Sequence, residues 1–523
     1  MKNATRRITT PLMNITRFLF KDKTELLVFF TAFLVEMTFG FYLLYKWGHT
    51  FVCGDAVSHL YIPRTLFDNQ PYNTFANLGT VWLPMFHLLV VPLVSIDPLC
   101  TTGFAGTIIN SFMTGGICVV LYRLIGEKKL GILASALFMC NAFTLTYGAT
   151  PMMEQTAIFF TVLATYYFKR YWEKDDTVEF MKCSLALIFG TLTRYEAWAV
   201  AFLVIFFFTL RELKNGQSYR VAYAHLPLWG IFAWVFWNLA IFRDPLMFIR
   251  QPGSVTFRNV SLWLVTNYVF QGVFAISGAL GLLAIISIAL LYKKSSQLAP
   301  TILLISPIIL HWSLMRSWSW IRLFYMGLPG LIALPLLLAN NFKKPLKVIT
   351  ITVVFIAYST IYPFQMSVVA TGSTSGVLSD IGFSDVSTWK GEVMAIKEVT
   401  GNQLTLLTAH FRALSPFFSV LTNTSPSRIF DEYDYPFYLE VMETPWKHCT
   451  FVVIEKTSPD DPELKSINDY YEEKYFVYRY YNDSEWGSTF LQHYELILET
   501  KHCLLFRLME RLPQTQMDRL HRF

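Results

Sequence analysis

The sequence predicts an all-α polytopic membrane protein that carries a small soluble domain toward its C-terminal end. Of its 523 residues, 54% are hydrophobic and only 15% are charged, which is more apolar surface than the core of a soluble protein can bury. The apolar residues gather in runs of about 16 to 28 residues, and a helix of about 20 residues crosses the hydrocarbon core of a bilayer. After residue 365 these runs end and acidic residues become frequent.

Eleven apolar runs indicate membrane-spanning helices. They cover residues 25–45, 103–122, 130–149, 155–169, 179–193, 197–212, 222–242, 263–292, 300–315, 321–340 and 347–365. A shorter apolar stretch at 80–96 contains Pro84, His87 and Pro92, which suit a re-entrant or interface helix better than a crossing. An even number of spans would instead place the C-terminus in the cytoplasm.

Basic residues determine the predicted orientation of these helices. Lys and Arg precede the first apolar run and recur in alternate short loops, and such residues favour the cytoplasmic side. The pattern holds from loop to loop if the stretch at 80–96 does not cross. We therefore expect a multi-pass protein with a cytoplasmic N-terminus and an extracytoplasmic C-terminal domain.

The charge balance divides the chain into two predicted domains. Residues 1–365 form the membrane module, with 15 Asp and Glu against 29 Lys and Arg, whereas residues 366–523 hold 22 against 14. In the second domain, strand-like runs alternate with polar or helical stretches, at 404–408, 428–431, 450–455, 494–499 and 503–508. This alternation favours a soluble α/β or α+β domain.

Ionisable residues near the helix ends fall mostly on the predicted outer side. Asp55 and His59 follow the first apolar run at positions i and i+4, so on a helix they share a face. A carboxylate within hydrogen-bond reach of a hydroxyl can act as a general base. Arginine suits a phosphate group because its guanidinium stays charged and binds two oxygens at once. The remaining candidates at this surface are Glu154, Arg194, Glu196, Arg243, Asp244, Arg316 and Arg322.

Three segments in this order resemble a known family. They are the Gly-Asp-Ala-x-x-His segment at 54–59, followed by Arg64 and the block at 78–84; the segment at 147–154; and the Thr-Arg-Tyr-Glu-Ala segment at 193–197. With them, the chain resembles the GT-C superfamily of integral-membrane glycosyltransferases. Within it, the chain is similar to prokaryotic members of the branch of protein O-mannosyltransferases and the aminoarabinose transferase of lipid A. The resemblance covers essentially the first 365 residues.

The resemblance implies a monosaccharide donor on a polyprenyl phosphate at the outer leaflet of a prokaryotic cell membrane, and an inverting displacement. Asp55 matches the acid that binds or deprotonates the acceptor. The candidates for holding the donor phosphate are Arg194, Arg322 and, third, Arg316. The candidates for further substrate contacts are His59, Arg64, Glu154 and Glu196. The expected partners are the lipid-linked donor, the bilayer, and a glycolipid, glycan or protein acceptor, with no nucleic acid.

No metal-ligand set is predicted. However, many family members carry a second acid where this chain has His59, which leaves a divalent metal open as a cofactor.

Each candidate also has a structural reading. Asp55 could be a solvated acid in a turn, Glu154 could stabilise a helix N-terminus, and Arg194 with Glu196 could be a structural ion pair.

Two other functional classes share this hydropathy. A transporter commonly shows inverted repeats and charges at the membrane midplane, and no repeat is found in the sequence. A non-enzymatic lipid or glycan-assembly protein would have the same hydropathy, but its function would not require Asp55.

Overall fold

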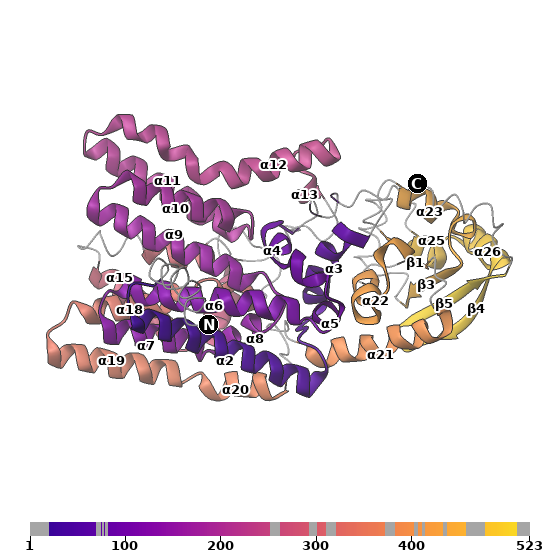
Figure 1. Cartoon of the computed structure of the whole chain (residues 1–523), viewed down its shortest axis with the longest axis horizontal. Coiled ribbons are helices and arrows are strands. Elements are labelled where there is room, and N and C mark those ends of the chain that lie inside the picture. Colours follow the sequence, from indigo (N-terminus) through magenta and orange to yellow (C-terminus); the bar gives the residue numbers. More distant parts are fainter. Residues whose placement is uncertain are drawn as a thin grey trace, which may run out of the picture.

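The computed structural model consists of a large helical bundle followed by a small domain built on a sheet (Figure 1). The structure describes residues 20–68, 75, 78, 82–250, 262–291, 301–309, 321–371, 382–401, 406–409, 414–431, 437–456 and 476–509. In Figure 1 the bundle lies on the left and the sheet on the right, with α3 (Gly54–Asp68) and α22 (Leu414–Thr422) between them.

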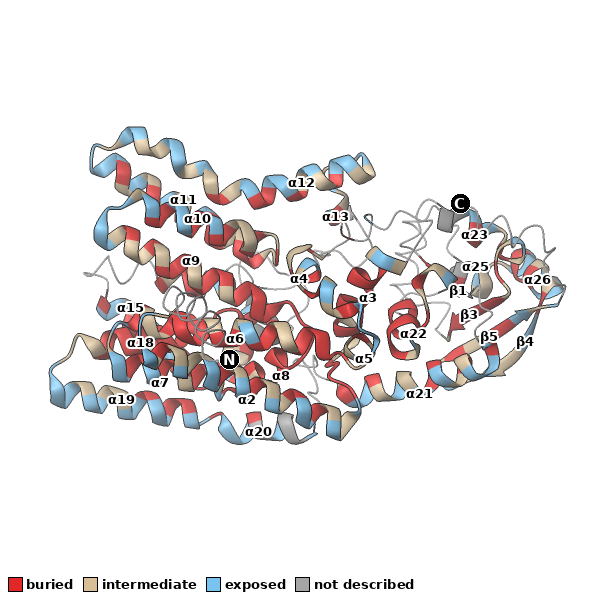
Figure 2. Cartoon of the chain, in the orientation of Figure 1, coloured by how far each residue is buried: buried red, intermediate tan, exposed pale blue. Residues whose placement is uncertain are grey.

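The first half of the bundle is organised around one buried helix, α6. Its helices are α2 (Lys23–Trp47), α6 (Phe104–Ile125), α7 (Lys128–Met139), α8 (Ala142–Gly148), α9 (Glu154–Lys174), α10 (Thr177–Thr191) and α11 (Glu196–Lys214). The side chain of Asp22 caps α2 by accepting from two backbone N–H groups, and Gly48 ends that helix with a left-handed φ of 71°. Helix α6 packs against α2, α7 and α9, and most of its residues are buried (Figure 2).

The second half of the bundle has a second buried helix, α18. Its elements are η2 (Ser218–Leu228), α12 (Trp229–Phe242), α13 (Met247–Arg250), α14 (Leu262–Ser277), α15 (Leu280–Leu291), a helical segment at 301–309, α17 (Ile321–Tyr325), α18 (Leu328–Asn340), α19 (Lys344–Ser359) and α20 (Tyr362–Thr371). Every residue of α18 from Leu328 to Ala339 is buried, so this helix forms part of the core.

Among the described residues, four helices are long and apolar enough to cross a membrane: Lys23–Trp47, Phe104–Ile125, Ser218–Phe242 and Lys344–Gln365. Two bent pairs raise the number to six if each pair is one span. The expected run at 130–149 is broken by 67°, where the Asn141 side chain caps α8. The run at 263–292 is broken by 100° next to Gly278, whose φ is +58°. The count of eleven spans stays a prediction.

The outer helices expose apolar side chains that would be unfavourable in water. On α2, Leu27, Phe30 and Phe41 are exposed, and α19 exposes Ile349 and Phe355. Large apolar side chains exposed repeatedly along a helix indicate contact with lipid or another apolar partner. Figure 2 shows the same contrast, with buried α6 and α18 inside and exposed α19 at the edge.

Three helices beside the bundle are not among the candidate spans: α3, α4 (Met85–Val94) and α5 (Asp97–Thr101). Helix α4 has 10 residues, or about 15 Å at 1.5 Å per residue, which is half the thickness of a hydrocarbon core. This length supports the expectation that 80–96 does not cross.

The C-terminal domain is a mixed five-stranded sheet with helices. Its helices are α21 (Phe383–Thr400), α22, η4 (Pro426–Arg428), α23 (Phe437–Glu443), η6 (Pro445–Lys447), α25 (Phe476–Asn482) and α26 (Ser484–His493). Its strands are β1 (Leu406–Ala409), β2 (Ile429–Phe430), β3 (Phe451–Glu455), β4 (Tyr494–Glu499) and β5 (Cys503–Leu508). The order is β2-β1-β3-β5-β4, parallel on the β2 side of β3 and antiparallel on the β4 side. A strand overlaps each of the five expected runs, and the ends of β4 and β5 coincide with the prediction.

Helix α3 joins the bundle to the C-terminal domain. It packs against α4 on one side and α22 on the other. The Tyr61 hydroxyl donates to the buried carboxylate of Asp431 at 2.7 Å, next to β2. Farther along α3, the Ser425 hydroxyl donates to the Asp68 carboxylate at 2.7 Å. The helix that begins at Gly54 is therefore fixed from both domains.

Candidate active site

The structure brings Asp55 and Arg322 together from opposite ends of the bundle sequence. Asp55 lies in the first turn of α3, where a carboxylate is stabilised by the helix N-terminus. Arg322 lies on the short helix α17, and its Nη2 donates to Asp55 Oδ2 at 2.6 Å across 267 positions of sequence. The Arg322 side chain is 6% exposed and that of Asp55 is 29% exposed. The carboxylate is therefore reachable, whereas its guanidinium partner is buried.

A second ion-pair group surrounds Arg194, in the turn between α10 and α11. Arg194 Nη1 donates to Glu154 at 2.7 Å and Nη2 donates to Glu196 at 2.8 Å. Glu154 begins α9 and is fully buried, and Glu196 begins α11. Both acids thus stand at helix N-termini, and both already compensate the charge of Arg194.

His59 connects these two groups electrostatically. Its ring is buried in α3, one turn after Asp55. Burial, the neighbouring His87 ring and the guanidiniums of Arg322 and Arg194 hold the pKa of His59 well below its usual range. Asp55, His59, Arg194, Glu154, Glu196 and Arg322 therefore form one cluster, which we call the acid–arginine cluster.

His87 belongs beside this cluster and is not among the predicted site residues. Nδ1 of His59 and Nε2 of His87 are 3.1 Å apart, and both rings are buried. Trp82 and Phe86 meet the edge or face of His59 at centroid distances of 5.0 and 5.9 Å. The signal in the sequence was a histidine inside the apolar stretch at 80–96, read there only as evidence against a crossing.

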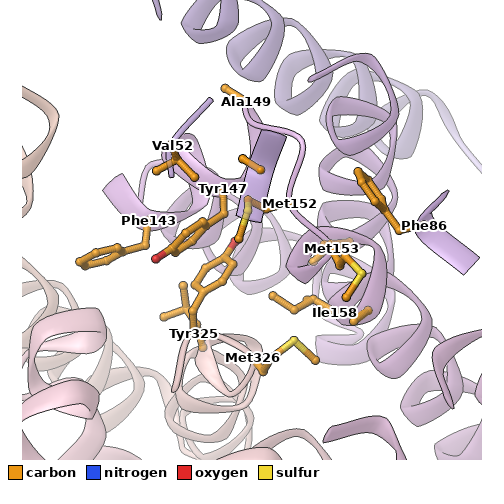
Figure 3. Packing of buried hydrophobic residues seen from close by; sticks show 14 of the residues in the cluster. Val52, Phe86, Phe143, Tyr147, Ala149, Met152, Met153, Ile158, Tyr325 and Met326 are labelled. Atoms are coloured by element: carbon orange, nitrogen blue, oxygen red, sulfur yellow. The ribbon is translucent and has the colours of Figure 1, made fainter. Parts of the chain in front are cut away.

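The segment at 147–154 contributes packing as well as Glu154. Tyr147, Met152 and Met153 are buried, and the Tyr147 ring lies 5.4 Å from that of Tyr325, just after Arg322 (Figure 3). The Tyr325 hydroxyl donates to the Gln155 side chain at 2.8 Å. This core holds α17 against the start of α9, and so fixes the distance between Arg322 and Glu154.

Among the predicted arginines that the structure describes, Arg64 is not brought into the cluster. Arg64 lies two turns farther along α3, where its Nη2 donates to Asn423 at 2.7 Å and lies 4.0 Å from Asp97. Its contacts therefore join α3 to α5 and to the C-terminal domain. Arg316 lies outside the described residues, as do positions 79–81 of the second sequence block.

The described residues contain no group of three or more His, Cys, Asp or Glu side chains arranged to hold a metal ion. The divalent metal that the sequence left open thus has no candidate ligand set in this part of the chain.

Comparison with solved structures gives the architecture a precedent. The aminoarabinose transferase ArnT from Cupriavidus metallidurans in its apo state matches with a TM-score of 0.52 at 10% identity, over 95% of this chain and 98% of that chain. The same protein bound to undecaprenyl phosphate matches at 0.51 and 11% identity, over 93% and 98%. The chain has the GT-C fold. The resemblance expected from the sequence is thereby confirmed at the level of the fold.

An oligosaccharyltransferase with this fold also matches. The enzyme from Archaeoglobus fulgidus, tethered to an acceptor peptide containing an NVT sequon, matches with a TM-score of 0.50 at 11% identity, over 88% of this chain and 72% of that chain. No protein-family model and no curated protein sequence matches the chain. At these sequence identities the likeness to GT-C structures shows the fold alone. The chemistry has to be argued from the acid–arginine cluster.

Proposed function

We propose that this protein is a membrane glycosyltransferase that transfers a monosaccharide from a polyprenyl-phosphate donor to an acceptor hydroxyl on the extracytoplasmic face. The observation that carries the proposal is the pair formed by Asp55 and Arg322 at 2.6 Å, at the junction of the bundle and the C-terminal domain. It places a reachable carboxylate beside a buried guanidinium. These two groups are what the acceptor and the donor phosphate would each need.

Asp55 acts as the general base in this proposal. The acceptor O–H gives its proton to the Asp55 carboxylate while the acceptor oxygen attacks the anomeric carbon of the sugar. The bond from that carbon to the phosphate oxygen breaks, and the polyprenyl phosphate leaves with the electron pair. Attack from the side opposite the leaving group inverts the anomeric centre. The exposure of the Asp55 side chain, 29%, supports access by an acceptor.

Arg322 is the first candidate for the leaving phosphate. Within the described residues, the acid–arginine cluster has two guanidiniums against three carboxylates, and Arg194 is already held by Glu154 and Glu196. Arg322 donates to the Asp55 carboxylate, whose side chain is 29% exposed, so a phosphate that reaches Asp55 also comes close to the Arg322 guanidinium. Arg194 is the second candidate through its remaining N–H groups, and Arg316 is the third. We assign secondary substrate contacts to His59, Arg64, Glu154 and Glu196.

The ligands of the structural neighbours support a lipid carrier, and the contact between α3 and the C-terminal domain supports an acceptor-binding region there. One GT-C neighbour was solved with undecaprenyl phosphate and another with an acceptor peptide. We propose a lipid-linked donor here too, presented from the outer leaflet of a prokaryotic cell membrane, with residues 1–365 as the transferase module and a cytoplasmic N-terminus. The C-terminal domain, residues 366–523, contacts α3 through Tyr61 and Asp431 and is the proposed binding region for a glycolipid, glycan or protein acceptor.

The test is transfer by the purified protein with a panel of labelled polyprenyl-phosphate sugars. Asp55→Asn keeps the side-chain shape but removes the base, so the rate should fall by about 10²- to 10⁴-fold. Asp176→Asn is the matched control, because Asp176 is an exposed acid that caps α10, lies outside the acid–arginine cluster and residues 366–523, and should leave the rate unchanged. Full activity in Asp55→Asn would overturn the role of Asp55, and absence of transfer with every sugar would count against the enzyme.

A further inference from the structure

Two histidines form a buried pair next to the acid–arginine cluster. His59 lies on α3 and His87 on α4, and Nδ1 of the first is 3.1 Å from Nε2 of the second. Both side chains are at most 1% exposed. At this distance one nitrogen must carry the hydrogen and the other must accept it, because two N–H groups or two lone pairs would repel.

The surroundings of His87 favour one of the two arrangements. Its Nδ1 is buried and has no hydrogen-bond partner among the residues that the structure describes. If Nδ1 carried the proton, a buried N–H would be left without an acceptor, and buried unpaired N–H groups are rarer in proteins than underused acceptors. The proton of His87 therefore belongs on Nε2, where it is donated to His59.

This arrangement defines the state of the His59 ring. Since Nδ1 of His59 accepts from His87, its own proton is on Nε2. Within the described part of the chain, no side chain or backbone group is hydrogen-bonded to this Nε2. The groups that act on the ring electrostatically are His87, Arg322 and Arg194, with Asp55 one helical turn away. Two neighbouring cations oppose a second proton, so the ring is neutral.

We propose that His59 is a neutral hydrogen-bond donor to the phosphate of the lipid-linked sugar, and that His87 is the positioning residue that fixes its tautomer. A neutral N–H binds a phosphate oxygen without adding a third cation near Arg322 and Arg194. The neutral ring therefore stabilises the phosphate anion, whereas a positively charged ring would also repel the two arginines. Trp82 and Phe86 enclose the ring and limit its rotation. This inference rests on the proposed function, which it deepens by naming a donor contact.

The experiment measures binding rather than transfer. Purified protein is titrated with polyprenyl phosphate and, in parallel, with the uncharged polyprenol of equal length. His59→Leu and His87→Leu should each weaken binding of the phosphate about tenfold, the effect of one charge-assisted hydrogen bond, and leave binding of the alcohol unchanged. His87→Gln restores an N–H donor near the position of Nε2 and should bind the phosphate within about threefold of the wild type. His225→Leu, at an exposed histidine on η2, is the control that should change neither affinity.

Measuring phosphate affinity over a range of pH shows whether His59 acts as a neutral donor or as a cation. With a polyprenyl methyl phosphate, a diester of constant charge, affinity should be flat between about pH 5 and pH 8. Affinity that falls as the pH rises through this range would show a charged histidine and overturn the proposal. So would unchanged phosphate binding in His59→Leu, or equal losses for phosphate and alcohol in His87→Leu, which would make the pair merely structural. Failure of the wild type to bind any polyprenyl phosphate would instead refute the proposed function.

Discussion

Replacement of Arg194 by Met tests whether this residue supports the fold, the chemistry or both. Its two partners lie at 2.7 and 2.8 Å, and at an effective dielectric constant of about 20 each contact is worth about 6 kcal/mol before desolvation. Much of that is offset by burying the charges. Removing one member of a buried ion pair nevertheless costs about 3 to 5 kcal/mol, because the remaining charge is left without its partner.

The expected result is a lower melting temperature for Arg194→Met, by at least about 5 °C in thermal unfolding of the purified protein. Arg507→Met is the matched control, since Arg507 pairs with Glu495 at the surface, where both side chains are about half exposed. An exposed pair contributes at most about 1 kcal/mol, so this variant should melt close to the wild type.

A triple variant separates stability from catalysis. Adding Glu154→Gln and Glu196→Gln to Arg194→Met removes the two uncompensated charges and should recover most of the lost stability. If Arg194 also binds the donor phosphate, the triple variant folds but transfers sugar slowly. Melting of Arg194→Met within about 1 °C of the wild type would refute the reasoning about charge. Wild-type transfer by the triple variant would remove Arg194 from the proposed phosphate site.

Two further predictions concern the loop after α2 and the close contact of α6 with the segment at 147–154. Burial, aided by nearby Lys390, lowers the pKa of His49 to about 4, and its Nδ1 accepts from a backbone N–H. Because the folded-state pKa is below the unfolded value, stability is complete above about pH 6.5 and decreases by up to about 3 kcal/mol as the pH falls to 4. Denaturant titrations should show a shallower pH dependence for His49→Gln, and an equal dependence would contradict this. A Cβ on Gly106 would lie 2.3 Å from the Pro151 Cα, so Gly106→Ala should lower the free energy of unfolding by about 1 to 3 kcal/mol and reduce the melting temperature. Gly391→Ala, whose Cβ meets nothing within 4 Å, is its control, and equal melting of the two would disprove the close contact.

Several elements of the fold were predictable from local sequence. Strands β4 and β5 end at the expected residues because a short apolar strand bounded by polar residues is a local pattern. The breaks next to Asn141 and Gly278 were not predicted. An apolar run shows how long a hydrophobic segment is, but not where its backbone bends, since the bend depends on a cap and on one residue's φ angle.

For the candidate site too, the residue types were predictable from the sequence but their contacts were not. Asp55 was recognisable because an acid directly after an apolar run is unusual, and Arg322 because arginine suits phosphate. Their contact was not recognisable, since 267 positions separate them and no spacing rule extends so far. The same holds for His87, because its proposed role depends on the 3.1 Å distance between its Nε2 and the Nδ1 of His59.

By itself, the sequence determined the class of the protein, its GT-C resemblance and the residue types available for chemistry, because hydropathy and charge act locally along the chain. Only the tertiary structure decided which arginine faces the carboxylate, that Arg194 is already compensated, and that Arg64 lies apart from the acid–arginine cluster. The physical reason is that ion pairing falls off within a few ångströms. Packing of α3, α9 and α17 sets those distances, and sequence position does not.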